Sequence, residues 1–402
     1  MDIAADAGGG GRVLGLRREV WREALVAWGA QRAIILSILL VWTLVLHTCA
    51  VAQGASCTFA PLFRFDAAEY AGIAQGGYSE VAQAAFAPVL PLLERAVMAA
   101  TFGNPLPAGL AVAWAAELVG LALLRELAEL DAGPDVARRT LYALALFPTS
   151  VFLVMPYAES LFLALSVGTF LAVRRRCWLL AGGLAALASL TRQVGLLLLA
   201  PLACGVIPVV AEHMRRRGTI GTRLRGLVPA VAALALPLIA AGGWQWYLDR
   251  QLGVTGVLAK AVDSPGWQRY VSWPWDGLVR DVGALVRPEP VGATIGVARD
   301  LLFLALWVAL ATALTVGWRR WPLDYVLYAW ASLAVVLVLP MHVDAVDALN
   351  SLPRYLLVVF PCVAVLGRWS GRSRLTTRIF LLVSLVLLTA VVGVLVAGGF
   401  IA

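Results

Sequence analysis

Apolar runs of about 20 residues recur along the whole chain, and they constrain its fold more than any other feature. The first lies at 33–52 and the last at 379–400. A helix of this length crosses the hydrocarbon core of a bilayer, whereas a membrane strand needs only about ten alternating residues. Charged residues make up 14% of the chain, against roughly 25% in soluble domains. The sequence therefore predicts an all-α, polytopic helical membrane protein.

We expect about eleven transmembrane helices in a single domain over 33–402, preceded by a cytoplasmic N-terminal tail over 1–32. Two external loops are predicted, at 53–106 with interfacial helices and at 244–295 with many tryptophans. After the first run, spans are expected at about 107–124, 140–173 (two), 178–211 (two), 226–243, 296–317, 325–340, 355–367 and 379–400.

Arginines set the orientation of these spans. Several lie between Arg12 and Arg32, before the first apolar run, and positive residues favour the cytoplasmic side. If 107–124 is the second span, the later arginine clusters also fall on that side. The net charge of +8 is thus distributed as a topology signal, which argues against nucleic-acid binding. We expect a multi-pass protein of the cytoplasmic membrane, with 53–106 outside.

Three shorter apolar segments are interrupted by polar or helix-breaking residues. The segment 88–103 is short and carries two prolines and the adjacent Glu94 and Arg95, which favours an interfacial helix over a span. The segments 140–173 and 178–211 each contain a polar elbow, at 155–160 and 191–195. Each half is shorter than a comfortable crossing, so we expect both elbows to line a cavity below the outer surface.

Two carboxylates follow the first span at short spacing. Asp66 and Glu69 are three residues apart, so they share a face if the segment is helical. A carboxylate at the edge of a cavity can remove a proton from a substrate hydroxyl that lies within hydrogen-bonding reach. The alternative is that either acid caps a helix or pairs with Arg64 in a solvated loop.

Two arginines are placed at the outer ends of spans, each beside a polar segment. The guanidinium of Arg192 or Arg354 can hold a phosphate through two parallel hydrogen bonds. The alternative is an arginine at a helix end that extends to lipid headgroups. Tyr157 and Glu159 either line the same cavity or only interrupt and cap the two short helices.

No residue pattern predicts a metal or another cofactor. His342, Asp344 and Asp347 resemble a metal cluster in content, but the segment has no Asp-x-Asp pair and reads as an ordinary polar loop. The cysteines are scattered without a Cys-x-x-Cys motif. Cys49 and Cys57 lie near the outer end of the first span and could form a disulfide.

Several blocks, in order along the chain, resemble one known family. They are Asp-Ala-Ala-Glu-Tyr with Ile-Ala and Gly-Tyr at 66–78, Phe-Ala-Pro-Val-Leu-Pro-Leu-Leu at 86–93, Phe-Pro-Thr-Ser with Pro-Tyr-Ala-Glu-Ser-Leu-Phe at 147–162, Leu-Thr-Arg with a following glycine at 190–195, and Pro-Arg-Tyr at 353–355. In this arrangement the chain is similar to the PIG-V-like branch of the GT-C mannosyltransferases, relatives of GPI mannosyltransferase 2. The likeness covers nearly the whole length.

The resemblance implies a GT-C transmembrane domain and an inverting mannosyltransferase. The donor would be polyprenyl-phosphate mannose on the extracytoplasmic face, the acceptor a lipid or glycolipid, and Asp66 the catalytic base. Phe65 departs from the tryptophan usual in the family, which leaves another sugar or acceptor open. The residues expected to contact substrate are Glu69, Tyr70, Tyr157, Glu159, Arg192 and Arg354.

Two other functions fit the same sequence. A transporter or flippase of lipid-linked sugars would use the same cavity and arginines without making or breaking a bond. A non-catalytic relative would keep the fold and bind the donor, but would not depend on Asp66.

Overall fold

The computed structural model confirms the all-α prediction and describes residues 12–13, 15–46, 58–215, 220–264, 267–287, 291–341 and 347–399. The strands of the described part are the two-residue pair β1 (Arg12–Val13) and β2 (Leu16–Arg17), joined antiparallel. The helices, in chain order, are α1 (Arg18–Val45), η2 (Ala60–Phe63), α3 (Asp66–Gly76), η3 (Ala82–Ala85), α4 (Val89–Met98), η4 (Ala99–Thr101), α5 (Pro105–Ala132), α6 (Pro134–Ala145), α7 (Val151–Val154), α8 (Ala158–Arg174), α9 (Trp178–Ser189), η5 (Gln193–Leu198), α10 (Leu199–Arg215), α11 (Ile220–Leu252), α12 (Val257–Val262), α13 (Asp276–Ala284), α14 (Val291–Val316), α15 (Leu323–Val338), α16 (Leu352–Val358), α17 (Phe360–Ser370) and α18 (Arg374–Val396).

Six helices of the described part are long and apolar enough to cross a membrane, and the bent pair α16–α17 makes a seventh if it is counted as one span. The predicted number of about eleven is therefore not confirmed. The difference arises at the shorter helices, such as α9 and the 16-residue α15. A helix rises about 1.5 Å per residue, so such segments fall short of the roughly 30 Å hydrocarbon core.

The first long helix begins earlier than the sequence predicts. α1 starts at Arg18, within the segment predicted as a cytoplasmic tail, and it includes Arg32. Arg32 is buried, and its Nη2 lies 2.7 Å from Glu117 Oε2 on α5. Its guanidinium also lies 3.9 Å from the ring centroid of Trp28. The pair with Glu117 allows the charged side chain of Arg32 to be buried between α1 and α5. The charge distribution in the sequence alone predicts this arginine at the membrane edge.

The described part of 53–106 contains two α-helices, α3 and α4, together with three short 3₁₀ helices. α4 exposes Leu92 and Leu93 and buries Leu90, which suits a helix that lies on a membrane surface. The sequence predicts Glu94 at the surface beside Arg95. In the structure the Glu94 side chain is buried, and its carboxylate lies close to Gly109 of α5. Neighbouring residues of a helix point in different directions, so the two side chains do not meet.

Both predicted elbows are present. The first separates α7 from α8, and the second separates α9 from η5. Gly195 packs so closely on the backbone of Ala188 and Ser189 that a side chain at this position would collide with them. The second elbow is therefore a tight turn and not a flexible break.

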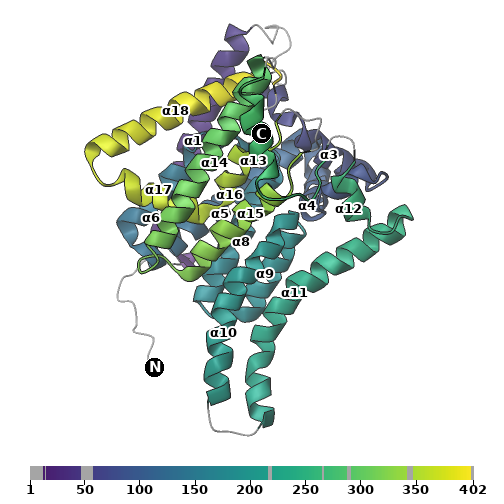
Figure 1. Ribbon diagram of the computed structural model, residues 1–402, viewed down its shortest axis with the longest axis vertical. Coiled ribbons are helices and arrows are strands. Elements are labelled where there is room, and N and C mark those ends of the chain that lie inside the picture. The colour runs from purple at the N-terminus through teal and green to yellow at the C-terminus, as the bar shows by residue number, and fades with distance from the viewer. Residues whose placement is uncertain are drawn as a thin grey trace.

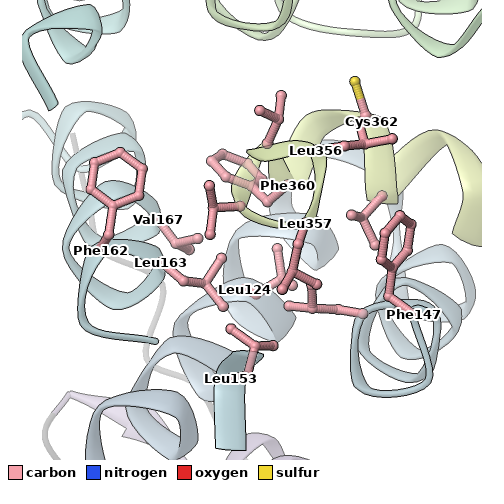
Figure 2. Close-up of a cluster of buried hydrophobic side chains, with 14 of the residues drawn as sticks. Leu124, Phe147, Leu153, Phe162, Leu163, Val167, Leu356, Leu357, Phe360 and Cys362 are labelled. Carbon is pink, nitrogen blue, oxygen red and sulfur yellow. The ribbon is translucent and has the colours of Figure 1, made fainter. Parts of the chain in front are cut away.

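The elbows and the late helices share one apolar core. Figure 2 shows Leu153 of α7 and Leu163 of α8 facing Leu357 and Phe360 around the break between α16 and α17. These last two helices meet at 81°. The core thereby fixes the start of α16 against the first elbow, although the two are far apart in sequence. The Thr149 hydroxyl reinforces this by donating to the Pro353 carbonyl at 2.9 Å.

The arrangement leaves α3, α4 and α12 together at one side of the bundle, while α10 and the first part of α11 extend side by side beyond it (Figure 1). The end of α15 lies near this side, because Val335, Val336 and Leu339 border the same cavity as Tyr70 of α3. The candidate site is therefore built where the first external loop meets the elbows and the ends of α15 and α16.

Candidate functional site

Four charged side chains from four separate segments form one network. Arg354 Nη2 of α16 lies 2.5 Å from Asp66 Oδ2 at the start of α3. Arg354 Nε donates to Glu159 Oε1 of α8, and Arg192 Nη1 from the second elbow donates to the same oxygen. Two carboxylates thus balance two guanidinium groups, which is the condition under which charges are tolerated in a buried site.

Strained backbone adjoins both ends of the Asp66–Arg354 pair. Phe65 and Ser351, the residues before α3 and α16, have φ of 56° and 81°. A residue with a side chain in this left-handed region costs about 1–3 kcal/mol, and such strain concentrates at ligand sites. The described part contains three further residues of this kind, at Phe102, Arg176 and Gln268. Two strained residues beside one ion pair indicate that the surrounding structure imposes its position.

The network is deepest at Glu159 and more open at Asp66. The Glu159 side chain is fully buried, whereas that of Asp66 is 15% exposed. Aromatic rings enclose the Arg354 guanidinium, whose carbon lies 4.7 Å from the ring centroid of Tyr157 and 5.5 Å from that of Phe152. A cation over an aromatic face is stabilised by the ring quadrupole. Arg354 is thus held by two carboxylates and two rings.

Two cavities meet at Asp66 and Arg354. The apolar cavity has a volume of about 370 Å³ and extends along Val194, Leu197 and Val336. The polar cavity has a volume of about 520 Å³. Its distinguishing lining residues are Phe65, Glu69, Glu80, Gln83, Asn350 and Ser351. Asp66 is therefore accessible from an apolar chamber on one side and from a polar chamber on the other.

The sequence-predicted residues fall into two groups. Asp66, Tyr70, Arg192 and Arg354 border the apolar cavity, and Glu69 borders the polar one. The two remaining residues, Tyr157 and Glu159, border neither cavity. Tyr157 donates its hydroxyl to the carbonyl of Arg64 at 3.0 Å, and Glu159 holds the two arginines. Their expected contact with substrate stays a prediction, and the geometry favours a positioning role.

The geometry argues against two of the alternatives for the charged residues, while Asp66 and Glu69 both lie in the first turn of α3, where acids also stabilise a helix N-terminus. Asp66 does not pair with Arg64, because Arg64 Nη1 donates instead to the Leu395 carbonyl at 2.7 Å. Arg192 and Arg354 do not extend to lipid headgroups, since both guanidinium groups are turned toward Glu159.

Arg269 is a third cation at the site, and no sequence pattern indicated it. It borders both cavities and donates to the carbonyls of Leu339 and Asn350, at 2.8 and 3.0 Å. Within the described part of the chain, no carboxylate forms an ion pair with it. It belongs to the tryptophan-rich loop, and the one signal in the sequence is the neighbouring Trp267, which borders the same cavities.

The possible Cys49–Cys57 disulfide lies wholly outside the described residues, and the group His342, Asp344 and Asp347 lies partly outside them. Cys49, Cys57, His342 and Asp344 are among the residues that the structure does not describe. Over the described ranges, no three His, Cys, Asp or Glu side chains are grouped as metal ligands would be.

The sequence matches no model of a known protein family and no curated protein. Among solved structures, it is similar to the oligosaccharyltransferase of the archaeon Archaeoglobus fulgidus. The apo form is 11% identical with a TM-score of 0.43, over 89% of this chain and 55% of that one. AglB in complex with an inhibitory peptide and a dolichol-phosphate is 13% identical with a TM-score of 0.42, over 89% and 56%. The chain therefore spans about half the length of the structures it matches.

Proposed function

We propose that this protein is an inverting membrane glycosyltransferase that moves a sugar, mannose by the sequence resemblance, from a polyprenyl-phosphate donor to a hydroxyl of a lipid or glycolipid acceptor. One observation carries the proposal: a carboxylate lies between an apolar and a polar cavity, beside arginines that border the same space. This is the arrangement that sugar transfer from a lipid phosphate requires, because it places a base and phosphate-binding cations around one point.

The apolar cavity suits the donor. Its walls of valine and leucine offer a surface for the first isoprene units, and Arg192, Arg269 and Arg354 border the same chamber. Guanidinium groups bind phosphate through parallel, charge-assisted hydrogen bonds. A phosphate held there would place the anomeric carbon near Asp66, with the acceptor entering through the polar cavity.

The reaction then needs one proton transfer. Asp66 accepts the proton of the acceptor hydroxyl while the hydroxyl oxygen bonds to the anomeric carbon and the bond from that carbon to the phosphate oxygen breaks. The configuration inverts, and polyprenyl phosphate leaves as an anion stabilised by the arginines. Arg354 links the two events, because a phosphate that draws its guanidinium away from Asp66 frees the carboxylate to act as base.

The arginine distribution supports the extracytoplasmic side for this reaction. The site lies on the loops that the positive-inside rule places outside the cell. A sugar donor carried by a membrane lipid is suited to that compartment, because the activated sugar arrives within the bilayer.

The direct test is release of polyprenyl phosphate. Purified protein is given polyprenyl-phosphate mannose and a lipid extract as acceptor, and the products are quantified for the wild type and for Asp66→Asn. We expect the variant to lose about 10²–10⁴-fold in rate, the range typical of a general base. Asp263→Asn is the matched control, because Asp263 is exposed in the tryptophan-rich loop and borders neither cavity at Asp66.

The same experiment separates the other functions. A flippase would move the donor across liposome membranes and release no polyprenyl phosphate. A non-catalytic protein would bind the donor equally well with Asp66 or with asparagine at this position. Full activity of Asp66→Asn would contradict the proposal.

A further inference from the structure

A large groove lies at the other end of the bundle, away from Asp66. Its volume is about 1450 Å³, and it is enclosed by the junction of α5 and α6, the end of α14 and the end of α17. Its rim carries five arginines: Arg139, Arg319, Arg320, Arg368 and Arg372. Among the described residues, Asp135 is the one acidic member of the lining. The groove therefore presents a strongly positive opening.

The arginines of the rim are available to a ligand. Four of them are exposed, with Arg139 half-buried, and no carboxylate of the described chain forms an ion pair with any of the five. Arg319 lies over the ring of Trp318 at 5.4 Å, and Arg368 over that of Trp321 at 5.9 Å. These contacts hold the guanidinium groups beside indole rings and leave their hydrogen-bonding edges free of acidic partners.

The interior of the groove is apolar. Leu306, Leu310 and Ala313 of α14 face Val365 and Leu366 of α17 across it. Tryptophans at the mouth, beside arginines, are typical of the membrane–water interface. The groove thus combines a charged mouth at headgroup level with an apolar interior that continues into the depth of the bilayer.

The groove and the Asp66 cavities lie at opposite ends of α15. Trp321 borders the groove just before this helix, and Leu339 borders the apolar cavity just after it. At about 1.5 Å per residue, the helix separates these two residues by roughly 27 Å. The helix is somewhat shorter than the hydrocarbon core of about 30 Å, but the two sites lie at opposite ends of the bundle, which favours opposite leaflets.

We propose that this groove binds the headgroup of an anionic phospholipid from the leaflet opposite the Asp66 cavities. The arginines match the phosphate charge, and the apolar interior accepts the first part of an acyl chain. A soluble phosphate would use the rim but not the interior, and its volume is far below that of the groove. The bound lipid joins the ends of α6, α14 and α17, so it stabilises the cytoplasmic end of the bundle. The site is independent of the reaction proposed above.

The test compares lipids on the purified full-length protein. The protein in neutral detergent is titrated with mixed micelles containing phosphatidylglycerol or, at the same mole fraction, phosphatidylcholine. Retained lipids are counted by native mass spectrometry, and the melting temperature is measured in parallel. We expect retention of phosphatidylglycerol with a rise in melting temperature, and roughly tenfold weaker binding in Arg319→Gln/Arg320→Gln.

A matched control removes the same charge from the same side of the membrane. Arg374 and Arg378 are exposed on α18 and do not border the groove, so Arg374→Gln/Arg378→Gln should bind as the wild type does. Arg368→Gln/Arg372→Gln is a second groove variant that serves if the first does not fold. Equal loss in control and groove variants would overturn the proposal, as would equal binding of phosphatidylcholine. Displacement of the lipid by millimolar inorganic phosphate would do so as well, since it would indicate a site for a soluble anion.

Discussion

Arg354 Nη2 lies 2.5 Å from Asp66 Oδ2, so the carboxylate proposed as the base is paired with a cation proposed to bind the leaving phosphate. The same guanidinium donates through Nε to Glu159. Arg354 therefore uses two nitrogens of its planar group, Nη2 and Nε, on two different carboxylates, and its position depends on both. Arg192 makes a simpler contact, with one nitrogen on Glu159.

This difference predicts unequal effects of lysine at the two positions. A lysine has a single ammonium on a flexible stem and cannot reproduce the fixed geometry of a guanidinium. Arg354→Lys should lose one charge-assisted hydrogen bond, worth about 1.5–3 kcal/mol, and thus roughly 10–100-fold in kcat/KM. Arg192→Lys should retain more activity, because one ammonium can replace its one donor to Glu159. Steady-state rates of polyprenyl phosphate release measure both, and equal losses would contradict the role of Arg354 in holding two carboxylates at once.

Glu159 is predicted to act as a positioning residue. Glu159→Gln leaves two guanidinium groups without their shared carboxylate in a buried site, where breaking an ion pair costs about 3–5 kcal/mol. We expect a lower melting temperature together with a higher KM for the donor, because both arginines lose their fixed place. The control is Glu126→Gln, which removes a carboxylate from a more exposed pair, since its partner Arg175 is 39% exposed and lies 2.8 Å away.

The outcome for Glu159→Gln distinguishes two roles. A residue needed only for stability would lower the melting temperature and leave the donor KM unchanged in the folded fraction. An unchanged melting temperature and an unchanged KM would show that Glu159 does not hold the arginines in solution.

The second elbow offers a prediction on close packing. Gly195→Ala should destabilise the protein by about 1–3 kcal/mol, the usual cost of overpacking, because the new methyl group meets the backbone of Ala188 and Ser189. The elbow carries Arg192, so activity should fall as well. Gly183→Ala on the adjacent α9 has open space around it and should stabilise the helix by up to about 1 kcal/mol. If the melting temperatures of Gly195→Ala and Gly183→Ala shift in the same direction, close packing at Gly195 is not the cause of the change.

Local patterns in the sequence predicted the parts of the fold that depend on local chemistry. The two elbows and the short interfacial helix α4 follow from helix-breaking and polar residues inside short apolar runs. The prediction that Asp66, Arg192 and Arg354 lie around one cavity relied on their places beside polar elbows and at the outer ends of spans, and the structure brings these residues together.

Features that depend on the rotation of one helix against another were not predictable. Whether Arg32 faces water or Glu117 depends on how α1 and α5 are turned, and mean hydropathy over a window contains no such information. The predicted number of spans is not confirmed, because the same average does not show how far each half-helix extends. Arg269 was missed because its loop has no periodic pattern, so nothing in the sequence placed it against the ends of α15 and α16.

The backbone at residues 348–349 is predicted to respond to pH through Asp281 on α13. Its carboxylate accepts hydrogen bonds from the backbone N–H groups of Ala348 and Leu349, at 2.7 and 3.2 Å, and so holds the segment that leads to Arg354. Burial is the main cause that raises the pKa of Asp281 to about 7, with the nearby Asp347 adding to it, while the two N–H groups and Arg280 act in the opposite direction. An unfolded aspartate has a pKa of about 3.9, so the folded state binds more protons between about pH 4 and 7.

The sign of the effect on stability follows from that difference. Where the folded state binds the extra proton, stability falls as pH rises, and it levels off above about pH 7. Asp281→Asn cannot titrate, so the melting temperature should fall less between pH 5 and pH 8 in this variant than in the wild type. Asp263 is exposed and lies in the same segment 244–295 as Asp281, so Asp263→Asn should keep the wild-type dependence of melting temperature on pH. Identical pH profiles of Asp281→Asn and the wild type would exclude Asp281 as the titrating group that couples the backbone at residues 348–349 to the position of Arg354.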